Sequence, residues 1–164
     1  MRNLVALVAG AGLALAVAAA KPAAAQDVDY LAFSLGAFDF INETTTEARI
    51  EYRSGRKTFN IGPTLGVMFN SKASLYVYGG FYLDLSFGRW VVMPNLAVGA
   101  YYEGNGKDLG HVVEFRSGVE LAYRFDDRSR LGIALHHISN ANIGDDNPGA
   151  ESLVVTYAIP FDRL

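Results

Sequence analysis

The stretch VVEFRSGVELAYRF, Val112–Phe125, is the clearest indication of the fold, because apolar residues alternate along it with polar or small ones. The odd-numbered positions are mostly apolar: Val113, Phe115, Ser117, Val119, Leu121, Tyr123 and Phe125. The even-numbered positions combine small residues with charges of opposite sign: Val112, Glu114, Arg116, Gly118, Glu120, Ala122 and Arg124. Successive side chains of a β-strand point to opposite faces, so this period of two predicts a strand with one apolar and one polar face.

Similar runs extend in both directions from this stretch, separated by segments rich in Gly, Asn, Asp and Ser, which favour turns. We expect eight strands: Tyr30–Phe40, Ala48–Tyr52, Lys57–Phe69, Ser74–Leu85, Trp90–Tyr102, Val112–Phe125, Ser129–Ile138 and Glu151–Phe161. No run shows helical periodicity, which predicts a single all-β domain.

Eight such strands fit two kinds of closed antiparallel barrel. A soluble carrier of the lipocalin type would turn its apolar face inward, whereas an outer-membrane barrel turns that face to lipid and encloses a small polar lumen. The runs reach the roughly 9–11 residues that cross a bilayer at a tilt. Small residues on the polar face suit a narrow lumen, and aromatic residues gather near the strand ends. The pattern therefore favours an eight-stranded antiparallel outer-membrane β-barrel, with the soluble carrier as the alternative.

The first residues have the pattern of a secretory signal peptide. Arg2 precedes the apolar run Leu4–Ala20, and small residues stand at Ala23 and Ala25. We predict cleavage after Ala25, so that residues 1–25 form the signal peptide and residues 26–164 form the barrel domain. The protein is then exported, with the outer membrane of a Gram-negative cell as its expected location.

Composition narrows the function further. The 164 residues carry a net charge of −3 and no cysteine, so the exported chain holds together without disulfides. A net negative charge gives no reason to expect a nucleic-acid partner. No apolar run after the signal peptide approaches the roughly 20 residues of a spanning helix.

Three polar residues share the outward face near the end of the chain. In the seventh run Leu131, Ile133 and Leu135 set the apolar face, and the alternation places His137 and Ser139 on it while His136 points into the lumen. In the last run the same alternation turns Glu151 outward, and a hairpin centred near Gly144 places it opposite His137. If both chain ends lie in the periplasm, this hairpin lies at the cell-exterior rim.

A serine, a histidine and a carboxylate at this spacing suit acyl transfer to water. Histidine takes the proton from the serine hydroxyl, and the carboxylate orients and stabilises the histidine. We therefore expect Ser139 as nucleophile, His137 as base and Glu151 as the orienting acid. Asn140, together with neighbouring backbone amides, would donate to the oxyanion. The alternative is a set of polar residues where a strand leaves the membrane.

The segments HHISNA, GAES and VVTYAIPF resemble the C-terminal signature of lipid A 3-O-deacylases, the PagL family of outer-membrane barrels. That signature pairs His-x-Ser-Asn-Ala with a glutamate twelve residues after the serine, as in His137, Ser139 and Glu151. The resemblance implies a serine esterase that cuts the 3-position acyl chain of lipid A and releases a 3-hydroxy fatty acid. One position departs from the pattern, because Asn142 stands where the family often has glycine.

Other residues give weaker signals. His111 is interpreted as a solvated loop histidine, and Asp145 and Asp146 as a hydrated loop rather than a calcium site. We expect no metal and no cofactor, and we expect lipid A or lipopolysaccharide and the outer membrane as partners. A homodimer is left open. The main rival is a non-catalytic barrel that stiffens the membrane or binds a surface partner.

Overall fold

The computed structural model describes residues 28–163, so the predicted signal peptide lies outside the described residues. Nine strands follow one another: β1 (Tyr30–Phe38), β2 (Thr45–Arg53), β3 (Ile61–Asn70), β4 (Leu75–Leu83), β5 (Leu85–Phe87), β6 (Trp90–Tyr102), β7 (Val113–Arg124), β8 (Arg130–Ser139) and β9 (Ala150–Pro160). A short 3-10 helix, Phe161–Arg163, follows β9. Within the described range, no helix is long and apolar enough to cross a membrane.

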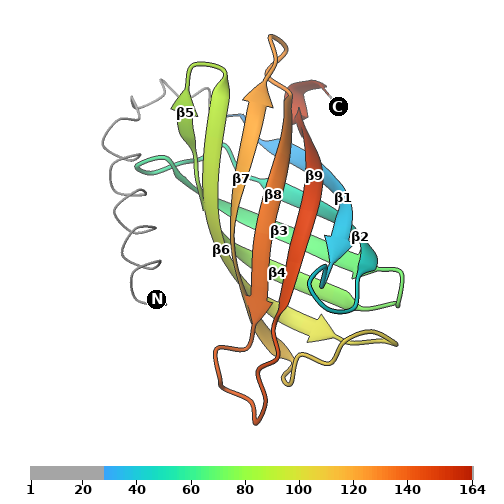
Figure 1. Ribbon diagram of the computed structural model, residues 1–164. Coiled ribbons are helices and arrows are strands. Elements are labelled where there is room, and N and C mark those ends of the chain that lie inside the picture. Colours follow the sequence, from blue (N-terminus) through green and yellow to red (C-terminus); the bar gives the residue numbers. More distant parts are fainter. Residues whose placement is uncertain (1–27, 164) are drawn as a thin grey trace, which may run out of the picture.

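The strands close into a barrel (Figure 1). Each pairs with its neighbours in antiparallel fashion, β1 also pairs with β9, and β4 also pairs with β6. Strands β4 and β5 continue the same register along β6, because Tyr82 is opposite Asn95 and Leu85 is opposite Val92. They therefore form one strand position interrupted at Asp84, and the predicted eight-stranded antiparallel barrel is confirmed.

The barrel is apolar outside and polar inside. On β8, the outward Leu131, Ile133 and Leu135 are 45%, 59% and 47% exposed, while the intervening Gly132 and Ala134 are buried. Exposed leucine, isoleucine and phenylalanine side chains cover most of the other strands in the same way. Such a surface suits a hydrocarbon surrounding, as the alternation predicts.

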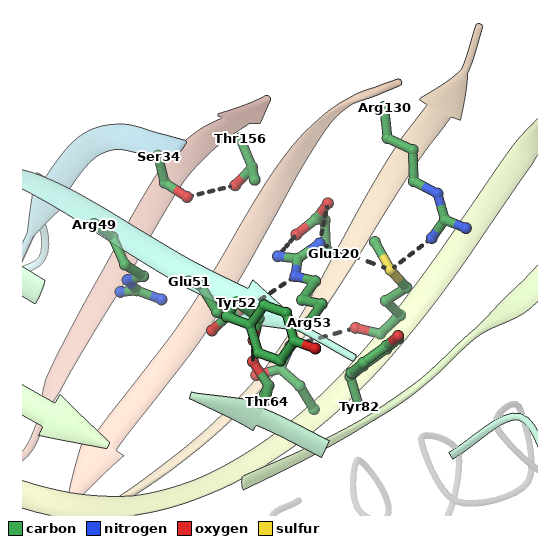
Figure 2. A network of polar contacts seen from close by, with 12 residues as sticks. Ser34, Arg49, Glu51, Tyr52, Arg53, Thr64, Tyr82, Glu120, Arg130 and Thr156 are labelled. Carbon is green, nitrogen blue, oxygen red and sulfur yellow. Dashed lines mark hydrogen bonds and ion pairs between the residues drawn. The ribbon is translucent and has the colours of Figure 1, made fainter. Parts of the chain in front are cut away.

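The lumen is filled with ion pairs rather than water-exposed charges (Figure 2). Arg53 contacts Glu51 and Glu120 at 2.8 and 2.7 Å, and Asp84 contacts Lys57 and Arg130 at 2.7 and 3.0 Å. All of these side chains are buried. Buried charges persist when they are paired, and removal of one partner typically costs about 3–5 kcal/mol. This pairing explains how charged residues of opposite sign on the polar face fit inside the narrow lumen.

The predicted first strand ends two residues early, at Phe38, the predicted fourth strand is divided at Asp84, and most other ends shift by one residue, but the larger differences lie in the second and third strands. Residues Lys57–Asn60, expected in the third strand, instead lead into a tight turn, where Phe59 and Asn60 have φ of 53° and 65° and Thr58 bridges Ile61. Two left-handed residues make a two-residue hairpin turn, which an Asn-Gly pair would have signalled more clearly. The second strand, expected over Ala48–Tyr52, is longer, because polar Thr45 and Glu47 continue the pairing with β1.

The two ends of the barrel differ. The connections 39–44, 71–74, 103–112 and 140–149 lie at one end, which we call the loop end. The connections 54–60, 88–89 and 125–129 lie at the other, the turn end, with the end of the described chain beside them (Figure 1).

Candidate active site

The β8–β9 hairpin brings His137 and Glu151 opposite each other at the loop end. Strand β8 ends at Ser139 and β9 begins at Ala150, and the register between them pairs His137 with Glu151. A shift of one residue would turn every apolar side chain of β8 into the lumen, so the alternation itself fixes this register.

Neighbouring histidines point to opposite sides of the barrel wall, as predicted. His137 is exposed on the outer face, and its side chain is about half accessible. His136 is buried in the lumen and is 5% exposed. Only His137 can therefore meet a molecule that approaches from the bilayer.

His137 and Glu151 form a hydrogen bond between Nδ1 and Oε1, at 3.2 Å. When Nδ1 carries the proton and donates to the carboxylate, Nε2 is left as an acceptor. The Cε1–Nε2 edge of the ring faces Gly149, because a Cβ at that glycine would lie 2.9 Å from Cε1 and 3.6 Å from Nε2. Nε2 is thus turned toward the loop end, where Ser139 lies.

Ser139 follows His137 on the same outer face, two residues closer to the loop end, and is partly exposed. Positions i and i+2 of a strand lie roughly 6.6 Å apart. Within residues 28–163 the Ser139 hydroxyl makes no hydrogen bond, and Nε2 of His137 makes none either. Catalytic hydrogen bonds are often long or unformed without substrate. A change of side-chain rotamer is the movement that would join these two atoms.

A second serine lies beside His137 and was not singled out from the sequence. Ser117 of β7 is opposite His137 and is exposed on the same face. Ser117 could have been noticed as a serine within the otherwise apolar outward set of Val112–Phe125, but the alternation does not reveal which residue lies opposite it on the next strand. The ring of His137 is hydrogen-bonded on its β9 side, away from β7, which favours Ser139 over Ser117 as its partner.

An apolar groove begins at these residues and crosses the outer wall of the barrel. Its volume is about 630 Å³, and it passes from β8 over β7, β6 and β4 to β3. The outward side chains along it form two rows that follow the strand register: His137, Ser117, Leu96, Phe81 and Pro63 in one, and Ser139, Phe115, Val98 and Gly79 in the other. A hydrocarbon chain that lay in this groove would end beside Ser139.

The chain turns sharply directly after Ser139 and Asn140. Ala141 and Asn142 both have left-handed backbone, with φ of 55° and 63°. Glycine is the most favourable residue in this region, and asparagine is among the few others that adopt it readily. Asn142 stands where the family often has glycine, and an asparagine can adopt the left-handed backbone that a glycine would take there. Among the described residues, the backbone amide of Ala141 has no hydrogen-bond partner.

Asn140 lies beneath this turn and is fully buried. Its side-chain amide donates to the carbonyls of Leu109 and Asp146, at 2.8 and 2.6 Å, and its carbonyl oxygen accepts from the amide of Asn142 at 2.9 Å. The structure thus places Asn140 next to the triad residues but engages both of its side-chain donors. In this arrangement the side chain holds the turn, and the amides of Asn140 and Asn142 are also engaged, which leaves the Ala141 amide as the free donor of residues 140–142.

The loops around the site are joined by buried polar contacts. Asp39, which follows β1, forms an ion pair with Lys107 of the 103–112 loop, at 2.9 Å. Burial acts to raise the pKa of Asp39, but hydrogen bonds from Asn42, Lys107 and the Glu43 amide outweigh it and hold this pKa below its usual value. The carboxylate therefore stays charged and keeps two loops together.

The remaining candidates lie away from the triad. His111 is exposed in the 103–112 loop, where its Nδ1 accepts from the amide of Val113 at 2.9 Å. Asp145 and Asp146 are exposed in the 140–149 loop. Across residues 28–163 no three His, Asp or Glu side chains gather as a metal site would require.

The comparisons with known proteins agree with the barrel fold. A sequence profile of the lipid A 3-O-deacylase (PagL) family matches residues 18–160. No curated protein matches the chain. The crystal structure of the outer membrane enzyme PagL is similar, with a TM-score of 0.64 and 19% identity, over 80% of this chain and 99% of that one. The crystal structure of Neisserial surface protein A has a TM-score of 0.58 at 11% identity, over 81% of this chain and 97% of that one. A designed transmembrane β-barrel also has a TM-score of 0.58, at 10% identity, over 82% and 95%.

Proposed function

Because the chain belongs to the lipid A 3-O-deacylase (PagL) family, and is therefore an outer-membrane lipid A deacylase, we propose that it cuts the 3-O-linked ester by serine catalysis. The supporting observation is the hydrogen bond between His137 and Glu151 on the lipid-facing wall, with Ser139 beside it. A bare polar pair on such a surface is costly, so a function is needed to explain it.

In the proposed reaction the Ser139 hydroxyl attacks the ester carbonyl of the acyl chain while Nε2 of His137 takes its proton. Glu151 holds the opposite nitrogen and stabilises the positive charge that develops on the ring. His137 then returns the proton to the sugar oxygen, which leaves. Water, activated by the same histidine, hydrolyses the acyl-enzyme and releases a 3-hydroxy fatty acid.

The oxyanion would be held by the turn at residues 140–142. The free amide of Ala141 is the nearest candidate donor, and Asn140 supports the proposal by fixing the backbone of the turn through three hydrogen bonds. A backbone N–H group that has no intramolecular partner can donate to a developing negative charge. Asn140 would thus contribute to the oxyanion site through the backbone that it holds.

The groove supports a lipid as the substrate. Its length on the apolar wall accommodates an acyl chain whose ester end lies at Ser139. We infer that the loop end faces the cell exterior, which places the triad at the outer-leaflet rim, where lipopolysaccharide lies. A homodimer stays a prediction, and the triad is complete within one chain.

The test uses purified protein in detergent with lipid A, with and without a metal chelator, beside the Ser139→Ala variant. We expect mass spectrometry to show loss of one 3-hydroxyacyl chain and the free fatty acid only with unmodified protein, in both buffers. Equal cleavage by Ser139→Ala would contradict serine catalysis. No cleavage by any protein would favour the non-catalytic barrel.

A further inference from the structure

The inner face directly behind the triad carries a second pair of register partners. His136 precedes His137 on β8, Ser152 follows Glu151 on β9, and the two are opposite each other in the lumen. Both are buried. Any group that holds His136 and Ser152 therefore holds the backbone from which His137 and Glu151 project outward.

Two charged side chains of β2 reach this pair across the lumen. Glu47 accepts a hydrogen bond from the Ser152 hydroxyl at 2.6 Å, and it forms a buried ion pair with Arg49. Nη1 of Arg49 lies 3.2 and 3.3 Å from the two ring nitrogens of His136. We call Glu47, Arg49, His136 and Ser152 the lumen clamp.

Glycines leave the space that the clamp needs. Strand β1 lies between β2 and β9, and its Gly36, opposite Glu47 and Val154, has no side chain there, so the Glu47 side chain can cross β1 beside the buried Phe38, which is the β1 partner of Ser152. On the other side, the ring of His136 lies against Gly118 of β7, where a Cβ would come within 2.3 Å of Cδ2. His136 is therefore confined between β7 and Arg49.

We propose that Glu47 and Arg49 are positioning residues of the active site, which act through His136 and Ser152 to fix the separation of His137 and Glu151. This inference rests on the proposed serine mechanism. A displacement of about 1 Å in a catalytic group can cost on the order of a hundredfold in rate. A smaller change in the separation of β8 and β9 is therefore expected to lower the rate about tenfold.

The decisive variant replaces the charged pair with apolar residues, Glu47→Leu together with Arg49→Met. Replacing a buried ion pair with apolar residues of similar volume is often neutral for stability, so the barrel is expected to fold. The matched control is Lys57→Met with Asp84→Leu and Arg130→Met, which removes a buried ion-pair cluster at the turn end and leaves none of its members unpaired. Ser139→Ala gives the baseline without the nucleophile.

We expect the clamp variant to lower kcat about tenfold with KM unchanged, and to slow labelling of Ser139 by a fluorophosphonate by the same factor. The control variant should stay within twofold in both assays. Equal losses in both variants, or an unchanged kcat in the clamp variant, would overturn the proposal.

If the clamp variant loses the heat-dependent gel shift of a folded barrel, Ser152→Ala is used to test the proposal instead. It removes one hydrogen bond and keeps both charges, and we expect about a threefold loss in kcat. Full activity of Ser152→Ala would then refute the clamp. Activity retained by Ser139→Ala would instead refute the underlying mechanism, which keeps the two failures distinct.

Discussion

Replacing Glu151 with glutamine should separate the charge of the triad acid from its shape. Glutamine keeps an oxygen that can accept from Nδ1 of His137, but it cannot stabilise a charged imidazole by ionic attraction. The observed separation of 3.2 Å sets the size of that attraction. Two unit charges at this distance attract with about 1.3 kcal/mol at a dielectric constant of 80, and about 5 kcal/mol at 20.

The lipid headgroup layer lies between these limits. A dielectric constant of about 40 gives roughly 2.6 kcal/mol, which corresponds to a rate change of about eightyfold. Glu151→Gln should therefore lower kcat by close to a hundredfold. Glu151→Asp retracts the carboxylate by about 1.5 Å, the length of one carbon–carbon bond, and keeps about 1.8 kcal/mol of the attraction, so its loss in kcat should be about fourfold.

The assay follows the release of 3-hydroxy fatty acid from lipid A at saturating substrate, with heat-dependent gel migration as the check on folding. The expected order of kcat is wild type, Glu151→Asp, Glu151→Gln. An aspartate variant slower than the glutamine variant would show that position, not charge, is decisive. A glutamine variant within threefold of wild type would refute the reasoning, and a loss confined to KM would assign Glu151 to substrate binding.

Three further outcomes are expected. Ser139→Ala should lose at least a thousandfold in kcat, whereas activity of the unmodified protein should survive a chelator, since base and oxyanion donors need no metal. His137→Ala should match Ser139→Ala in the same mass-spectrometric assay, because the two act as one unit. The Asp39 contacts should hold at neutral pH and be lost as pH falls through the lowered pKa of this carboxyl. Pepsin cleavage of the 103–112 loop should then rise with acidity in the wild type and show less pH dependence in Asp39→Asn.

The alternation in the sequence was enough to predict the barrel and the outward face of the triad. A period of two leaves no freedom once one strand face must meet lipid, so His136 and His137 could be assigned from Leu131 and Leu135 alone. The pairing of His137 with Glu151 followed from one hairpin. Ser117 could not be paired with His137, since the register between β7 and β8 depends on a turn whose length the alternation does not fix.

The role of Asn140 shows where sequence reasoning ends. A polar residue beside a nucleophile reads as a donor to substrate, but its partners Leu109 and Asp146 come from two loops whose approach no pattern reveals. The left-handed backbone of Ala141 and Asn142 was equally hidden, although the glycine of the family pattern pointed to it. The links of the lumen clamp cross strand β1, and such contacts depend on the curvature of the closed wall.

The groove along β8 to β3 is open to the surrounding bilayer, so a substrate chain does not enter an empty site there. In water an apolar groove stands empty of hydrocarbon until a ligand fills it. Here the tails of neighbouring lipids already cover it, and a lipid tail is about as apolar as the leucine beneath it. A substrate chain that enters therefore replaces another chain and gains little from its own length. We expect discrimination among lipids to reside at the ester and the sugar, within reach of the loop end, while the tail follows wherever the head is held.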